Sequence, residues 1–212
     1  MSGSYDFEEQ ERIAELKAWW EDNRGYVIGA IAAAILVFAG YRGWIWWSAR
    51  QAEDAAAMFK PVAEAMKAED PKSLAQAADP LIDKHPGSYF ASEAALAVAK
   101  AAFDKGDLAE AQKRLRGVMD HGAPTHRGVA RLRLASVLLD EKRFDDALKV
   151  LDGNKDEAFA APVADLRGDI MLAQGRLDEA RAAYKLAMDK AGPGNPVRSV
   201  AGTKLSALGG SE

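Results

Sequence analysis

The sequence predicts an all-α protein, in which one N-terminal transmembrane helix precedes an α-solenoid of about four helix pairs and a C-terminal capping helix. Three observations support this fold class. An uncharged run near the N-terminus is flanked by tryptophans. Alanine-rich patterns with helical spacing fill the rest of the chain, and small residues recur in them at a period near 34.

The transmembrane helix is predicted from residues 26–41, "YVIGAIAAAILVFAGY", which contain no charged side chain. Sixteen helical residues cover only about 24 Å, whereas extension to Trp47 gives 22 residues and about 33 Å, close to the roughly 30 Å of a bilayer core. A buried core helix and a cleavable signal peptide are the alternatives. The 24 residues ahead of the run are acidic rather than short and basic, so we expect an uncleaved anchor over residues 25–47.

Aromatic side chains mark both ends of the expected span. Tryptophan has an apolar body and one polar N–H group, so it suits the boundary between lipid and water. Arg42 lies one turn from the end of the span, where a long side chain can reach the headgroups. The predicted membrane-interface anchors are Trp19, Trp20, Arg42, Trp44, Trp46 and Trp47.

Residues 1–24 form an acidic segment with seven carboxylates and three basic residues. Ile13, Leu16 and Trp20 recur at helical spacing, which predicts an amphipathic helix lying on the membrane surface. A docking helix for a cytosolic partner is the alternative. Three Lys or Arg residues precede the span and two or three follow it, so the positive-inside rule does not decide the orientation.

Residues 48–212 contain an internal repeat. The segments "KGDLAEAQKRL" (105–115), "EKRFDDALKVL" (141–151) and "QGRLDEARAAY" (174–184) share one pattern, and "KSLAQAADPL" is a weaker, earlier copy. Their alanines are separated by 34, 36 and 33 residues, and a second small residue precedes each alanine by twelve positions. The two sets are Ala77, Ala111, Ala147 and Ala180, and Ala65, Ala99, Ala135 and Gly168.

This period is typical of tetratricopeptide-like helix pairs, whose two helices cross closely at small residues. Large residues four positions after each alanine are expected to pack against the neighbouring repeat, and the polar turns "DKGD", "DEKR" and "AQGR" to join the helices of a pair. Asn195 and Pro196 indicate the start of the capping helix, in which Gly202 lies 34 residues after Gly168. The large residues are Leu81, Leu115, Leu151 and Tyr184.

The sequence shows no catalytic, metal-binding or cofactor-binding pattern. His85, His121 and His126 lack the spacing of metal ligands, cysteine is absent, and no nucleophile or phosphate-loop motif occurs. Residues 25–212 carry no net charge, because the first 24 residues account for the whole net charge of −4. We therefore expect no enzyme, no cofactor, no nucleic-acid binding and no small-molecule substrate.

Binding to another protein remains as the expected activity. The first helices of such pairs line the concave face of the solenoid, and their apolar residues make a groove suited to an apolar or amphipathic peptide segment. The alternative for each residue is a place in the core between the helices. The candidate groove residues are Val62, Met66, Leu96, Phe103, Leu132, Leu139 and Leu172.

The acidic, Trp-containing lead-in, the single span and the segment "VADLRGDIMLAQGRLDEARAAYKLAM" (163–188) resemble the YfgM family of ancillary subunits of the bacterial SecYEG translocon. The resemblance implies a single-pass inner-membrane protein with a cytoplasmic N-terminus and a periplasmic repeat domain. It also implies a complex with the periplasmic chaperone PpiD beside SecYEG, which passes secreted client chains to the periplasmic chaperone network. For some members it implies a link to stress regulation through the cytoplasmic segment.

Two other interpretations stay open at this point. The first is a membrane-anchored tetratricopeptide scaffold that assembles another envelope machine, such as a pilus or a secretion apparatus. The second is an adaptor whose repeat domain faces the cytosol. Both use the same fold and the same anchor, so the residues alone do not distinguish them from a translocon subunit.

Overall fold

A computed structural model describes the backbone of residues 3–209 and the side chains of residues 11–209. The chain divides into two compact units, residues 1–51 and residues 52–212. This boundary falls four residues after the expected start of the repeat domain at residue 48. The acidic side chains of residues 6–10 lie outside the described residues.

The described residues form nine α-helices and one short 3₁₀ helix, and no strand occurs among them. This confirms the predicted all-α class. Helix α1 continues through residues 24 and 47, where the lead-in and the anchor were expected to end. The elements are α1 (Gly3–Lys67), α2 (Pro71–Lys84), α3 (Tyr89–Asp104), α4 (Leu108–His121), α5 (Pro124–Asp140), α6 (Phe144–Asp152), η1 (Glu157–Phe159), α7 (Ala160–Ala173), α8 (Leu177–Lys190) and α9 (Pro196–Ala207).

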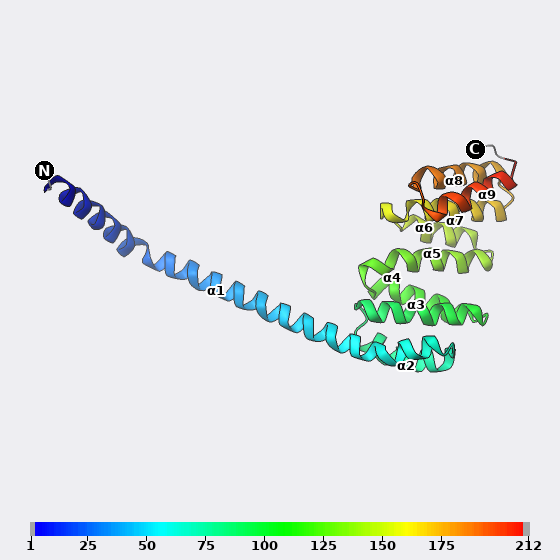
Figure 1. Cartoon of the computed structure of the whole chain (residues 1–212), viewed down its shortest axis with the longest axis horizontal. Coiled ribbons are helices and arrows are strands. Elements are labelled where there is room, and N and C mark those ends of the chain that lie inside the picture. The colour runs from blue at the N-terminus through cyan, green and yellow to red at the C-terminus, as the bar shows by residue number, and fades with distance from the viewer. Residues whose placement is uncertain (1–2, 210–212) are drawn as a thin grey trace. The chain divides into compact units, whose positions relative to one another are not determined.

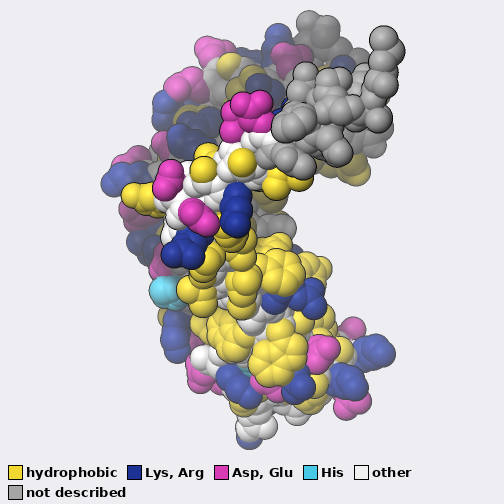
Figure 2. All heavy atoms as spheres, turned by 90° about the vertical axis from the view of Figure 1, so that its left-hand side faces the viewer, with side chains coloured by type: hydrophobic (Ala, Val, Ile, Leu, Met, Phe, Trp, Pro, Cys, Tyr) yellow, Lys and Arg dark blue, Asp and Glu magenta, His cyan; other side chains and the backbone are white. Residues whose placement is uncertain are grey.

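Helix α1 carries the predicted span. Among the described residues it is the one helix long and apolar enough to cross a membrane, and its most apolar stretch is not buried against other parts of the protein. Its large apolar side chains, such as Ile35, Leu36 and Phe38, are exposed. Figure 2 shows hydrophobic side chains gathered on the side of the molecule that faces the viewer.

The second unit is a stack of antiparallel helix pairs, in which each helix packs mainly against its neighbours in the chain (Figure 1). The first helices of the pairs are the end of α1, α3, α5 and α7, and the second helices are α2, α4, α6 and α8. Helix α9 packs against α8 and α7 and closes the stack, as predicted. The core lies between these layers as three linked clusters of buried apolar side chains.

The close approach within the last three pairs depends on the predicted small residues. Ala111, Ala147 and Ala180 are fully buried where the second helices meet the first ones. A methyl group placed on Gly168 of α7 lies only 2.4 Å from the ring of Tyr184 in α8, so this crossing tolerates only glycine. The predicted large residues of the second helices, Leu81, Leu115, Leu151 and Tyr184, are all buried.

In the first repeat the predicted register is wrong by three residues. Val62 and Leu74 occupy the crossing, because they stand seven residues before and five residues after the turn residue Glu69. Ala99 and Ala111 have the same spacing around Gly106. Ala77, which was expected at the crossing, is only partly buried. The first pair therefore accommodates larger side chains at its crossing than the later pairs do.

Each pair turns through a residue with left-handed backbone conformation. These residues are Glu69, Gly106, Lys142 and Gly175, with φ of 52°, 79°, 59° and 76°. In the last three turns the next residue donates its N–H to a carbonyl five residues earlier, as Asp107 does to Ala102 at 2.9 Å. This bond satisfies a carbonyl at the end of the first helix.

A polar network attaches the capping helix α9 to the last pair. Lys204 of α9 donates to Asp165 and Asp169 of α7, at 2.8 Å each, and the Tyr184 hydroxyl donates to Asp169 at 2.9 Å. Burial raises the pKa of the Asp165 carboxyl above its ordinary value, although the bond to Lys204 acts in the opposite direction. At the start of α9, the Asn195 side chain accepts a hydrogen bond from the N–H of Val197.

The crossing at Gly168 gives the first prediction. We expect Gly168→Ala to lower the free energy of unfolding by roughly 1–3 kcal/mol, because the new methyl group overlaps the buried Tyr184 ring. Gly117→Ala in α4 is the matched control: no atom lies within 4 Å of its added methyl group, so alanine should stabilise the helix by up to about 1 kcal/mol. Thermal unfolding of the full chain in detergent micelles measures both. Equal effects of the two variants would contradict the packing argument.

The left-handed turns give the second prediction. We expect Lys142→Gly to stabilise the protein by about 1 kcal/mol, because glycine adopts this conformation without steric cost, whereas Lys142→Ala should have little effect. Gly106→Ala should destabilise it, although open space surrounds the added methyl group. Chemical unfolding curves of the three variants provide the measurement. A stabilising effect of Lys142→Ala as large as that of Lys142→Gly would contradict the conformational explanation.

Candidate protein-binding groove

Two adjoining hollows lie along α3. The larger, of about 560 Å³, extends from the end of α1 and the following turn to α3. The smaller, of about 310 Å³, lies between α3, α4 and α5. Both are lined by Lys100, Asp104 and Arg133, so they form one surface, which we call the α3 groove.

Three of the predicted groove residues line the α3 groove. Met66 and Leu96 line the larger hollow, and Phe103 lines the smaller one. Met66 and Phe103 are 38% and 37% exposed, so a bound segment can reach them. Leu96 is only 4% exposed, which makes it a core residue at the floor of the groove.

The other four candidates lie elsewhere. Val62 is completely buried at the crossing of the first pair, so it belongs to the core, which was the alternative interpretation. Leu132 and Leu139 are half-buried and pack against the central core cluster. Leu172 is 38% exposed near the end of α7.

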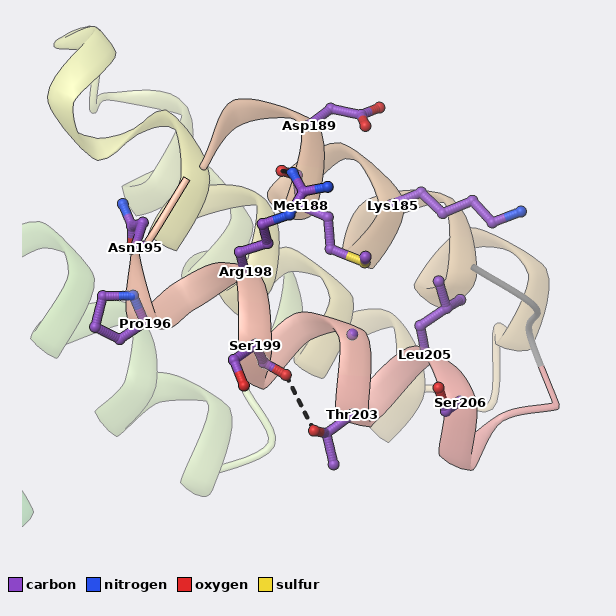
Figure 3. Close-up of a pocket in the computed structure, with 12 residues that line it drawn as sticks. Lys185, Met188, Asp189, Asn195, Pro196, Arg198, Ser199, Thr203, Leu205 and Ser206 are labelled. Atoms are coloured by element: carbon purple, nitrogen blue, oxygen red, sulfur yellow. Dashed lines mark hydrogen bonds between the residues drawn. The ribbon is translucent and has the colours of Figure 1, made fainter. Parts of the chain in front are cut away.

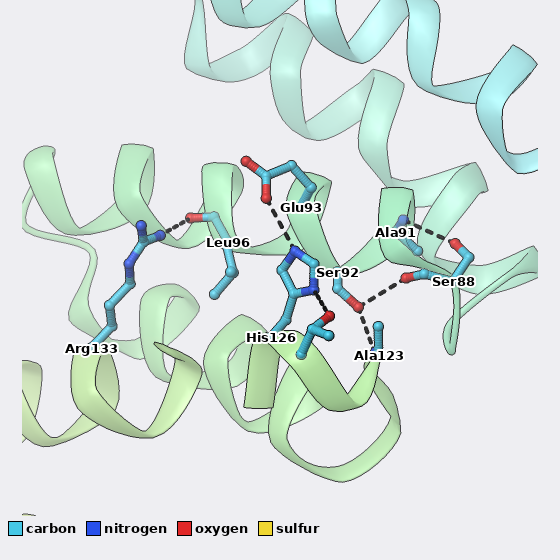
Figure 4. A network of polar contacts seen from close by, with 9 residues as sticks. Ser88, Ala91, Ser92, Glu93, Leu96, Ala123, His126 and Arg133 are labelled. Atoms are coloured by element: carbon cyan, nitrogen blue, oxygen red, sulfur yellow. Dashed lines mark hydrogen bonds and ion pairs between the residues drawn. The ribbon is translucent and has the colours of Figure 1, made fainter. Parts of the chain in front are cut away.

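The polar residues of the groove were missed in the sequence. Arg133 is exposed and donates to the backbone oxygen of Leu96 at 3.3 Å, so its guanidinium stands at the junction of the two hollows (Figure 4). Lys100 forms an ion pair with Asp104 one turn away. Lys100 directly follows the small residue Ala99, but only apolar side chains were predicted to line the groove.

A buried polar network fixes the start of α5 against α3 beside the groove (Figure 4). The Ser92 hydroxyl donates to the carbonyl of Ser88 at 2.9 Å and accepts from the N–H of Ala123 at 2.8 Å. The His126 ring contacts Glu93 at 3.2 Å and lies 4.6 Å from the Tyr89 ring. His126 and Ser92 are buried, and their hydrogen bonds connect residues that lie 33 and 31 positions apart in the chain.

The described residues show no metal-binding arrangement. No group of three or more His, Cys, Asp or Glu side chains among residues 11–209 is arranged to hold a metal ion. His85 is buried and contacts Asp54 at 2.9 Å, which is a structural contact between α1 and the end of α2.

The predicted membrane-interface residues are exposed along α1. Trp19 and Trp20 are 53% and 43% exposed, and the later cluster is similar. The Arg50 guanidinium lies 5.1 Å from the ring centre of Trp46, so the second cluster also includes a cation–π contact. The structure places Trp44, Trp46, Trp47 and Arg42 on the exposed surface of the same helix.

Comparison with known proteins agrees with the repeat pattern. The tetratricopeptide repeat-like domain family matches residues 17–210. A protein of Aggregatibacter actinomycetemcomitans named "Ancillary SecYEG translocon subunit" is 31% identical over 89% of this chain and 93% of its own length. The chain belongs to the YfgM family. Family members with the same name occur in Escherichia coli K12, at 31% identity over 84% of this chain and 85% of theirs, and in Neisseria gonorrhoeae, at 28% over 95% and 97%.

The fold also occurs outside the YfgM family. The solved structure titled "MamA 41-end from Desulfovibrio magneticus RS-1" superposes with a TM-score of 0.56 and covers 73% of this chain and 82% of its own. Its sequence identity is 19%, so the likeness concerns the fold alone.

Proposed function

We propose that this chain is a membrane-anchored ancillary subunit of the SecYEG translocon that helps to pass secreted chains to periplasmic chaperones. The observation that carries the proposal is the likeness to the named translocon subunits over nearly the whole chain, span and repeats together. The apolar helix α1 supports a single-pass place in the inner membrane.

The proposal includes the orientation and the partners that the family resemblance implies. The N-terminus lies in the cytoplasm, and the repeat domain lies in the periplasm beside a PpiD-like chaperone. Tethering raises the effective concentration of the repeat domain near the translocon exit, so weak binding in the α3 groove is sufficient. The apolar side chains of Met66 and Phe103 support contact with apolar segments, and Arg133 supports an added polar contact.

Affinity purification of the full chain in mild detergent tests the partners. We expect SecYEG and PpiD to be identified by mass spectrometry. Exchange of residues 25–47 for an unrelated span should reduce the recovery of SecYEG. Removal of residues 52–212 should abolish the recovery of the membrane-anchored periplasmic chaperone PpiD, because in this proposal the repeat domain binds it. Recovery of another envelope complex without SecYEG would replace this proposal with the scaffold interpretation.

The α3 groove is tested by changes that leave the core intact. In the same purification, we expect Met66→Glu to reduce the amount of the partner that binds in the α3 groove about fivefold. The reason is that the variant places a charge where an apolar side chain is buried on binding. SecYEG recovered through the span should be unchanged. Leu186→Glu on α8 is the matched control, since Leu186 is 47% exposed and lies away from the α3 groove. Loss of the same partner with both variants would show that the groove is not the site.

A further inference from the structure

A hollow of about 1020 Å³ lies at the far end of the stack, between α8 and α9 (Figure 3). Lys185, Met188 and Asp189 of α8 line one side of it. Arg198 and Gly202 of α9 line the other side. We call this hollow the end groove.

Helix α9 has the features of the first helix of a fifth pair. Gly209 follows it with φ of 71°, the conformation of the turn residues that lead from first to second helices. The N–H of Gly209 donates to the carbonyl three residues earlier at 3.0 Å, as that of Gly106 does at 2.8 Å. Gly202 lies seven residues before Gly209, as Ala99 lies seven residues before Gly106.

The end groove repeats a surface that is covered elsewhere in the chain. Aligned on their turn residues, α8 corresponds to α2 with an offset of 106 and α9 to α3 with an offset of 103. In this alignment the three α8 residues that line the end groove correspond to three residues of α2, which line the hollow between α2, α3 and α4. The pairs are Lys185 with Asp79, Met188 with Ile82, and Asp189 with Asp83. Arg198 falls on Ala95, which lines that same hollow.

Helix α4 covers this surface in the first half of the stack. Its Arg114 and Val118 close the hollow over α2 and α3, and Ala111 and Leu115 are buried with them. Helices α6 and α8 pack in the same way on α5 and α7. None of the described residues covers α9 at the equivalent place, so the end groove is a helix-binding position without a helix.

The charges of the end groove specify its occupant. In the covered surface, Arg114 of α4 pairs with Asp79 of α2 at 2.6 Å. The residue at the position of Asp79 in α8 is Lys185, which has the opposite charge. Lys185 forms no ion pair with an acidic side chain within the described part of the chain, whereas Arg198 donates to the backbone oxygen of Met188 at 2.8 Å. A helix that packs here therefore needs an acidic residue where α4 carries Arg114.

We propose that the end groove docks an amphipathic α-helix of a partner protein, which completes the fifth helix pair. Its apolar residues take the places of Ala111, Leu115 and Val118, and an acidic side chain one residue before the central one pairs with Lys185. Helix-in-groove recognition of this kind uses residues spaced three and four apart on one face. The inference goes beyond the proposed function, since it names a second surface and does not depend on the α3 groove or on the translocon.

Two peptides test the proposal with the full chain in detergent micelles. Both have the sequence of residues 108–121 and a staple on the outward face, because isolated helices of this length are marginal in water. One keeps arginine at position 114, and the other has glutamate there. Fluorescence anisotropy of the labelled peptides measures their dissociation constants.

We expect the glutamate peptide to bind about threefold to fivefold more tightly than the arginine peptide, the effect of one partly exposed ion pair. Lys185→Glu should reverse this preference. Lys149→Glu on the exposed face of α6 makes the same change in net charge elsewhere and should leave it unaltered. Ser206 lines the end groove at an exposed position of α9, so Ser206→Trp should obstruct the groove. We expect it to raise the dissociation constants of both peptides at least tenfold while the thermal unfolding temperature stays unchanged.

Three results would overturn the proposal. The first is that neither peptide binds to the wild-type chain. The second is that Lys185→Glu and Lys149→Glu alter the preference equally, because the charge effect is then not local. The third is a dimer in analytical ultracentrifugation that Ser206→Trp dissociates, because the end groove then binds a second copy of the chain instead of another protein. Failure of the SecYEG purification leaves all three readouts unaffected.

Discussion

The repeat domain depends on how closely the two helices of each pair approach one another. At Gly168 no methyl group fits beside the Tyr184 ring, and alanines with no exposed surface occupy the matching positions of the second helices. Close packing of this kind gains dispersion energy from many short contacts and leaves no room for a larger side chain. The stacking of the pairs, the position of the α3 groove and the open surface of α9 all follow from this spacing.

The architecture could be predicted from the sequence because one geometric requirement recurs at a fixed period. The paired small positions give the later repeats correctly, whereas the first repeat is displaced by three residues because Val62 and Leu74 are larger than the alanines that were sought. The groove was predicted less well. Helical spacing alone does not separate a core residue such as Val62 from an exposed one such as Met66, because both face inward on α1. Arg133 was not predicted, because only apolar side chains were expected to line the groove.

The two grooves differ in the chemistry that they offer. The α3 groove joins apolar side chains such as Met66 to a single exposed guanidinium, a combination that suits segments of varied sequence. The end groove is more polar and has the shape of a helix position that is filled in the other pairs. The charge of Lys185 makes it the more selective surface, because specificity arises where a wrong charge is repelled as well as where a right one is bound.

The core is divided into three clusters, which are joined by single bridging side chains. Ile82 packs against the first and central clusters, and Leu148 against the central and last ones. Solenoids with nearest-neighbour packing open locally from their ends, and α8 and α9 form one of these ends. A helix seated in the end groove closes that end. Occupancy at that site therefore changes the exchange lifetime of the last repeat, and with it the resistance of this part of the chain to proteases.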